Sequence, residues 1–241
     1  QNRNGGLYDK FRNRLMLPVI DTRGDVVAFG SRVLDKSEPK YMNSSETPVY
    51  SKRRVLYGLN LAKKSKRPNI ILCEGNLDIV TLHQAGFDNA VASMGTALTV
   101  EQTRLLSRFT KELVLCYDND NAGKIATERA LQILNGSEFS VKVLQLPRRL
   151  VDGEYIKQDA DDFIKNYGPA AFENLLSGSE NGVEFRMAQI AGKYDLKDDE
   201  ARIAYCGEVS ELLASLPGAV EREIYTGRAA EAAGITAEAM K

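Results

Sequence analysis

The hydrophobic residues between positions 69 and 147 occur in short, nearly continuous runs that alternate with amphipathic segments. The apolar runs, which predict four strands, are residues 69–74, 90–95, 112–118 and 139–147. The amphipathic segments, which predict the connecting helices, are residues 77–87, 99–109 and 122–134. Strands without polar alternation that are separated by helices indicate a parallel sheet covered on both faces. The fold class predicted for the centre of the chain is therefore α/β.

The flanking segments follow other patterns. Two apolar runs within residues 15–34 surround a polar turn and predict a strand, a turn and a second strand, whereas residues 35–54 are polar and irregular. After Pro147 we expect a short loop and two helices, the second of which has Pro169 in its first turn. The remaining pattern is helical. The helices expected there are residues 182–192, 198–216, 219–233 and one that opens at Thr236.

These patterns divide the chain into three predicted zones, a basic α+β segment (1–68), a parallel α/β centre (69–178) and a helical tail (179–241). In an open parallel sheet, ligands bind beyond the carboxyl ends of the strands, near the point where the strand order reverses. We expect the strand order 2-1-3-4, which makes the first and third strands neighbours. Acidic residues follow the predicted strands: Glu74 and Asp78 the first, Asp118 and Asp120 the third, and Asp159 and Asp161 the fourth.

Carboxylates gathered at one edge of a sheet oppose one another's ionisation unless a cation lies between them. Oxygen ligands without His or Cys favour Mg²⁺ or Mn²⁺, and Mg²⁺ bound by a few carboxylates keeps positions open for phosphate oxygens. Any one of these clusters alone has an ordinary explanation, because Asp is favoured at helix N-termini. Their joint position at the strand ends of one sheet predicts a metal site.

Composition narrows the class of protein. The chain has three cysteines, no CxxC pair and one histidine, so we expect no zinc site and a reduced, cytoplasmic protein. No apolar stretch is long enough to cross a membrane. Residues 1–68 contain 15 Lys and Arg against 6 Asp and Glu, and the rest of the chain contains 17 against 27. A basic segment beside an acidic one suggests a polyanion-binding surface next to a carboxylate site, although solvated lysines are an alternative.

Two motifs in order resemble the Toprim domain. They are Glu74-Gly75 with Asp78 after the first strand, and Tyr117-Asp118-Asn119-Asp120 with Gly123 after the third. The flanking motifs resemble the bacterial replicative primases among the Toprim families. These motifs are residues 7–16, 29–34, 39–44, 56–59 and 92–96. The chain departs from the family pattern at Asn76, Leu77, Asn119 and Ala160, and the last of these leaves the register of the third acidic cluster open.

The resemblance implies roles for particular residues. Glu74, Asp118 and Asp120 match the family's principal metal ligands and are the expected catalytic residues. Further acidic positions around the metal are matched by Asp78, Asp159 and Asp161. Basic positions for nucleotide or template phosphates are matched by Arg32, Lys40 and Lys52, with Tyr41 and Asn43 beside them.

A Toprim-type primase core implies a DNA-directed RNA polymerase that makes primers from NTPs on single-stranded DNA, with Mg²⁺ or Mn²⁺ as cofactor. It also implies a bacterial, nucleoid-associated protein with the replicative helicase as partner. The chain starts at Gln1, and we expect a piece of a longer protein in which the zinc ribbon and the helicase-binding domain lie outside this piece. Another Toprim enzyme, such as a nuclease or topoisomerase, and a non-catalytic DNA-binding module remain alternatives.

Overall fold

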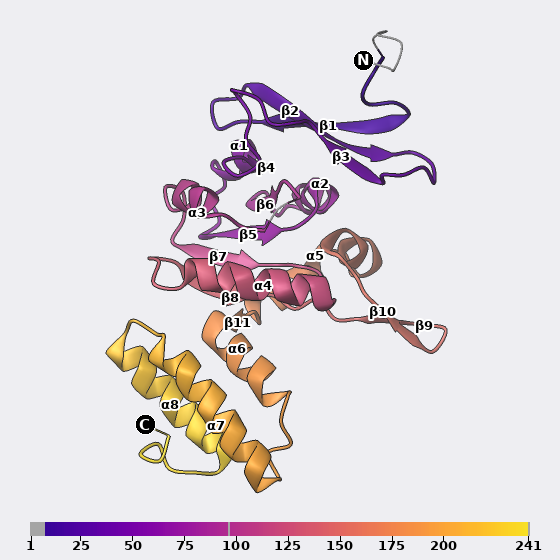
Figure 1. Cartoon of the computed structure of the whole chain (residues 1–241). Coiled ribbons are helices and arrows are strands. Elements are labelled where there is room, and N and C mark those ends of the chain that lie inside the picture. Colours follow the sequence, from indigo (N-terminus) through magenta and orange to yellow (C-terminus); the bar gives the residue numbers. More distant parts are fainter. Residues whose placement is uncertain (1–7, 96, 241) are drawn as a thin grey trace.

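The computed structural model describes residues 8–95 and 97–240. Its central sheet, as far as the described residues show, has six strands in the order β11-β8-β7-β5-β6-β4 (Figure 1). The inner, parallel strands are β5 (Asn69–Cys73), β6 (Ala90–Ser93), β7 (Glu112–Leu115) and β8 (Ser140–Val143). Across the sheet these four strands lie in the order β6-β5-β7-β8. Numbered by their order in the chain, this is the predicted order 2-1-3-4, so the prediction is confirmed.

The two edge strands of this sheet come from the flanking zones. They are β4 (Leu56–Tyr57), antiparallel to β6, and β11 (Glu180–Asn181), antiparallel to β8. Neither was predicted, because two residues are too few to show a period. The short helix α1 (Leu59–Ala62) follows β4, and its Leu59 and Ala62 are buried in the core of the central sheet.

Hydrophobic cores on both faces explain why the inner strands have no polar alternation. Successive side chains of a strand point to opposite faces. In β5, Leu72 belongs to a core that includes Leu106 of α3 and Leu131 of α4, whereas Ile71 belongs to the opposite core, with Phe172 of α5. The helices concerned are α2 (Asn76–Gln84), α3 (Val100–Leu106), α4 (Asn121–Leu134) and α5 (Ala160–Ser177). Helix α5 is interrupted at Gly168, where φ is 79°, in agreement with the two helices expected there.

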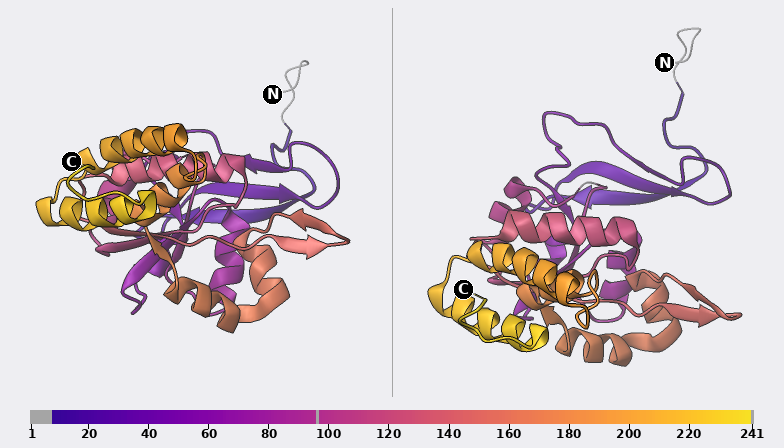
Figure 2. Two further views of the ribbon diagram at one scale, coloured as in Figure 1. Left: turned by 90° about the horizontal axis from the view of Figure 1, so that it is seen from below. Right: turned by 60° about the horizontal axis from the view of Figure 1, so that its bottom comes forward.

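The basic segment forms a separate antiparallel sheet from β1 (Arg14–Ile20), β2 (Val26–Val33) and β3 (Tyr41–Asn43). Its first turn closes as predicted, because Asp21 Oδ1 accepts hydrogen bonds from the backbone N–H groups of Arg23, Gly24 and Asp25. This sheet lies along one side of the central sheet, as Figure 1 and the right view of Figure 2 show.

The tail contains α6 (Gly182–Ala191), α7 (Asp199–Ala214) and α8 (Ala219–Ala233), which share their own hydrophobic core. The expectation of a further helix from Thr236 is wrong within the described residues, where residues 237–240 form turns. Met240 is nevertheless buried in the tail core, and its carbonyl oxygen accepts a hydrogen bond from the Ser210 hydroxyl. None of the helices in residues 8–95 and 97–240 is long and apolar enough to cross a membrane.

The expectation of a short loop after Pro147 is also wrong. The chain there forms a hairpin of β9 (Arg149–Val151) and β10 (Glu154–Ile156), which extends away from the rest of the molecule (Figure 1). Asp152 and Gly153 connect the strands with φ values of 49° and 85°. A two-residue turn with both φ values positive matches the right-handed twist of the strands, which is why Asp-Gly favours hairpins.

Candidate metal and nucleic-acid site

An open pocket of about 560 Å³ lies at the carboxyl ends of β5 and β7, beside the N-terminal sheet. Carboxylates and basic or polar side chains line it together. The lining residues are Arg32, Lys40, Tyr41, Asn43, Glu74, Gly75, Asn76, Leu77, Asp78, Gly95, Asp118, Lys157, Asp159, Asp161 and Asp162. Of the predicted site residues, only Asp120 and Lys52 are not part of this lining.

Glu74 and Asp118 follow adjacent strands and meet, as the strand order predicts. The backbone N–H of Asp118 donates a hydrogen bond of 3.3 Å to Glu74 Oε1. Burial raises the pKa of Glu74 above its usual value, and the Asp118 carboxylate adds to the rise. Burial likewise raises the pKa of Asp118. Two half-buried carboxyls of raised pKa at adjacent strand ends have the electrostatics of a site that a cation would stabilise.

Asp78 connects the start of α2 to the start of α5. Its Oδ2 accepts a hydrogen bond from Gly75 N–H at 3.0 Å, and its Oδ1 accepts one from Asp161 N–H at 3.2 Å. The side chain is buried, with 7% of the residue exposed. Burial raises its pKa to about 7, and the nearby Asp159 carboxylate contributes to the rise.

The third acidic cluster begins helix α5. Asp159 caps the helix by accepting a hydrogen bond from Asp162 N–H at 2.7 Å. One carboxylate oxygen from each of Asp159, Asp161 and Asp162 lies within 4.8 Å of the others. The register left open by Ala160 therefore brings all three carboxyls together, including Asp162, which was not among the predicted ligands. Burial raises the pKa of Asp159, with the Asp162 and Asp161 charges adding to it.

Lys157 is a second charged residue of this site that was not among the predicted site residues. Its Nζ lies 2.9 Å from Asp120 Oδ2 and 3.5 Å from Asp118 Oδ2. Asp120 also caps α4 by accepting a hydrogen bond from Gly123 N–H, so its carboxylate turns toward the helix and the lysine. The hydrogen bond from Lys157 lowers the pKa of Asp120, whereas the more buried Asp118 has a raised pKa despite the same lysine.

Gly123 allows the tight approach of the Asp118–Asp120 loop to α4. A Cβ atom at position 123 would lie 1.9 Å from the carbonyl oxygen of Asp118, which is far inside van der Waals contact. Only glycine, which has no Cβ atom, fits at this position, because the start of α4 lies directly against the Asp118–Asp120 loop.

The N-terminal sheet supplies the basic wall of the pocket. Arg32 and Tyr41 are paired across β2 and β3, and the guanidinium lies 5.9 Å from the centre of the Tyr41 ring. Lys40 Nζ lies 5.6 Å from the same ring. Arg32 Nε is buried and has no hydrogen-bond partner among the described residues, so it has a donor to offer an anion. Burial raises the pKa of Tyr41, although the Arg32 guanidinium lowers it, and the Asp78 carboxylate on the other side of the pocket lining adds to the rise.

Asn43 fixes the wall to the central sheet by donating a hydrogen bond from Nδ2 to the carbonyl oxygen of Met94 at 3.4 Å. Lys52 occupies a different position. Its backbone carbonyl accepts a hydrogen bond from Gln102 of α3, and its N–H donates to Glu46, outside the pocket lining. Its assignment to phosphate binding remains a prediction that the pocket does not support.

The donor set fits Mg²⁺ or Mn²⁺. The ligating atoms available are carboxylate oxygens, which these hard cations prefer, and several of the carboxyls have pKa values raised by burial and mutual repulsion. The Lys157 ammonium already holds a position between two of the carboxylates, which shows that the site accommodates a positive charge.

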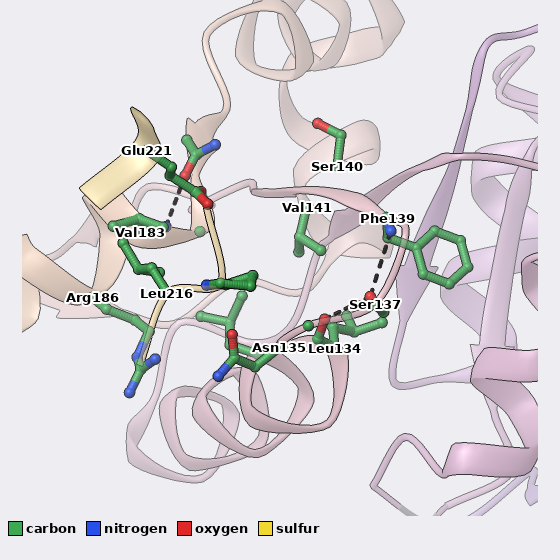
Figure 3. Close-up of a pocket in the computed structure, with 15 residues that line it drawn as sticks. Leu134, Asn135, Ser137, Phe139, Ser140, Val141, Val183, Arg186, Leu216 and Glu221 are labelled. Atoms are coloured by element: carbon green, nitrogen blue, oxygen red, sulfur yellow. Dashed lines mark hydrogen bonds between the residues drawn. The ribbon is translucent and has the colours of Figure 1, made fainter. Parts of the chain in front are cut away.

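A second pocket, of about 230 Å³, lies where the central sheet meets the tail (Figure 3). Leu134 and Val141 line it from the sheet side, and Val183 and Leu216 from the tail. Arg186, also labelled there, is paired with Glu128 at 3.3 Å. None of the predicted site residues lines this pocket.

Three family models match the chain in sequence order. The first, described as DNA primase catalytic core, N-terminal domain, matches residues 1–63. A Toprim-like model matches residues 71–164. A model described as DnaB-helicase binding domain of primase matches residues 183–238. The expectation that the helicase-binding domain lies outside the chain is therefore wrong. The sequence did not reveal this region because helical periodicity identifies only the buried side of the tail helices. A partner is recognised by exposed residues, which follow no period.

Individual proteins and structures agree with these matches. The DNA primase of Clostridium acetobutylicum is 40% identical over 239 residues, which are 99% of this chain and 39% of that protein. The chain thus spans less than half of this relative. A crystal structure of a DNA primase domain from Pseudomonas aeruginosa has a TM-score of 0.81 and 34% identity, and the match covers 100% of this chain and 74% of that one. A DnaG primase catalytic domain bound to ssDNA has a TM-score of 0.79 and 34% identity, over 95% of this chain and 71% of that one.

Proposed function

Because the chain belongs to the bacterial DNA primase family, in which it corresponds to the catalytic core, we propose that it synthesises short RNA primers on single-stranded DNA. The observation that carries this proposal is the pocket in which acidic and basic walls face each other. Polymerisation needs a cation beside a triphosphate. In this pocket the carboxylates would bind the cation, and Arg32 and Lys40 would bind the triphosphate. The relative bound to ssDNA supports the assignment of the template.

The carboxylates proposed to hold the metal are Glu74, Asp78, Asp118, Asp120, Asp159 and Asp161. When bound, Mg²⁺ would neutralise phosphate charge and increase the acidity of a primer hydroxyl. In the reaction, a 3′-hydroxyl oxygen forms a bond to the α-phosphorus of an NTP, and the bond to pyrophosphate breaks. As an alternative to binding the metal, Glu74 would accept the hydroxyl proton, since its raised pKa in the metal-free protein makes it a stronger base than an exposed glutamate.

The side chains of the basic wall would position the nucleotide. Arg32 has an unpaired, buried Nε donor, and Lys40 lines the same pocket. Guanidinium and ammonium groups bind phosphate oxygens with charge-assisted hydrogen bonds. Phosphate contacts carry no sequence information, so template binding through this wall would be sensitive to salt and indifferent to sequence.

We also propose the replicative helicase as a partner of the tail. The support is the match of residues 183–238 to the helicase-binding model. Helices α6, α7 and α8 fill this range and have a hydrophobic core of their own, so their outward faces are available for a partner.

NTP incorporation on single-stranded DNA with Mg²⁺ or Mn²⁺ tests the proposal in the full-length protein. Asp118→Asn should abolish primer synthesis while DNA binding is retained, because the change removes charge from the metal site and leaves the basic wall intact. Asp199→Asn, at an exposed position of α7, is the matched control and should synthesise normally. Normal synthesis by Asp118→Asn would contradict the metal assignment, and metal-dependent DNA cleavage without NTP incorporation would indicate a Toprim nuclease.

A further inference from the structure

The β9–β10 hairpin has an exposed apolar face. Leu150 and Tyr155 are directly paired across the two strands, and 57% and 70% of these residues are exposed. Residues opposite each other in an antiparallel pair lie on the same face of the ribbon. Large apolar side chains that gather on a projecting element and are covered by no other described segment indicate a contact surface.

The hairpin is held firmly at its base. Gln158, which is 2% exposed, donates a hydrogen bond of 2.8 Å from Nε2 to the carbonyl oxygen of Pro147 and so joins the two ends of the hairpin. Arg149 on the face opposite Tyr155 donates a hydrogen bond of 2.9 Å to Asn166 of α5. These contacts position the hairpin against α5 and leave the Leu150–Tyr155 face free.

This free face is continuous with the candidate site. Lys157 comes directly after β10, two residues beyond Tyr155. Lys157 reaches Asp118 and Asp120 at the metal site. In Figure 1 and in both views of Figure 2, the hairpin and the N-terminal sheet extend to the same side of the molecule, and in Figure 1 the carboxyl ends of β5 and β7 point to that side between them.

We propose that the Leu150–Tyr155 face is a stacking surface for unpaired bases of the DNA template, forming a second wall opposite the basic wall of β2 and β3. This proposal rests on the proposed primase function. Unpaired bases expose aromatic faces that stack on tyrosine, whereas duplex bases are already stacked on their neighbours. Arg148, which is exposed next to the hairpin, supplies positive charge for an adjoining phosphate. The face therefore offers an aromatic side chain for the bases and a nearby positive charge for the phosphates of single-stranded nucleic acid.

Fluorescence anisotropy with a labelled single-stranded oligonucleotide, in the full-length protein, tests the surface. Tyr155→Ala should weaken binding by roughly 5-fold or more, as expected for the loss of one stacked base. Tyr155→Phe keeps the ring and should bind like the parent protein. Val220→Ala, at a position of α8 that is 74% exposed, is a control for removal of a surface side chain. Because Tyr155 is exposed, these variants should have the parent's melting temperature.

Two outcomes would overturn the proposal. If the parent protein binds single-stranded DNA and Tyr155→Ala binds equally well, the hairpin is not a template wall, although the primase assignment stands. If the parent protein neither binds the oligonucleotide nor makes primers, the primase assignment fails and the proposal fails with it. Equal weakening by Tyr155→Ala and Tyr155→Phe would also overturn it, since stacking needs the ring and not the hydroxyl.

Discussion

The buried carboxyl of Asp78 should make the stability of the metal-free protein depend on pH. Its folded-state pKa is about 7, compared with an ordinary value of 3.8. A carboxyl with a raised pKa binds its proton more tightly in the folded state than in the unfolded state. The contribution of Asp78 to stability is therefore full at low pH and is lost as the pH rises toward 7.

The structure gives the size of this effect. The pKa difference is about 3 units, and each unit corresponds to about 1.4 kcal/mol, so the whole titration is worth at most about 4 kcal/mol. Between pH 5 and pH 8 the titration of Asp78 should lower the free energy of unfolding by roughly 2–3 kcal/mol. Glu74, Asp118 and Asp159 have pKa values raised in the same direction and should steepen the same trend.

Thermal or urea unfolding in a chelator across this pH range measures the trend. The parent protein should lose stability from pH 5 to pH 8, and Asp78→Asn, which does not titrate, should lose less. Adding Mn²⁺ should restore stability most at pH 8, where the carboxylates are ionised, by about 3 kcal/mol at a metal concentration 100 times the Kd. Asp88→Asn, at an exposed position, is the matched control. If Asp78→Asn and the parent protein lose stability equally, burial of Asp78 is not the cause.

Three further predictions concern neighbours of the site. Lys157→Met should tighten Mn²⁺ binding up to about 5-fold, measured by calorimetry, because an exposed ion pair worth at most about 1 kcal/mol no longer competes for Asp118. Gly123→Ala should destabilise the protein by about 1–3 kcal/mol in urea unfolding and weaken metal binding, because its Cβ would displace the Asp118 loop. Lys40→Ala should weaken single-stranded DNA binding and lower its salt slope by about one, whereas Lys52→Ala, outside the pocket, should change both less.

The sequence predicted the parts of the fold whose period extends over several residues. The inner strands were visible because both of their faces are buried, and α3 was visible because residues 99–109 are amphipathic. Strands β4 and β11 were missed because each is fixed by pairing with a distant strand. The hairpin was missed although its turn carried the signal Asp152-Gly153.

The site was predictable where it depends on strand order and unpredictable where it depends on loops. Glu74 and Asp118 meet because parallel neighbours end at the same edge of the sheet. Lys157 follows no motif and lies 37 positions from Asp120 in the chain, so the hairpin alone brings it to the site. Lys52 shows the opposite case, in which a basic residue close to the matched motifs in sequence lies outside the pocket.

Backbone donors hold four carboxylates of the site in place, those of Glu74, Asp78, Asp120 and Asp159. Each of these four carboxyls accepts a hydrogen bond from the N–H of a residue in its own or a neighbouring segment, whereas Lys157 pairs with Asp118 and Asp120, and Lys165 pairs with Asp161. The pairs, acceptor first, are Glu74 and Asp118, Asp78 and Asp161, Asp120 and Gly123, and Asp159 and Asp162. An N–H group carries only a partial positive charge, so the carboxylates are fixed in position and still repel one another. A cation that enters such a site relieves the repulsion and has few side chains left to order, which is the energetic basis of a preformed metal site.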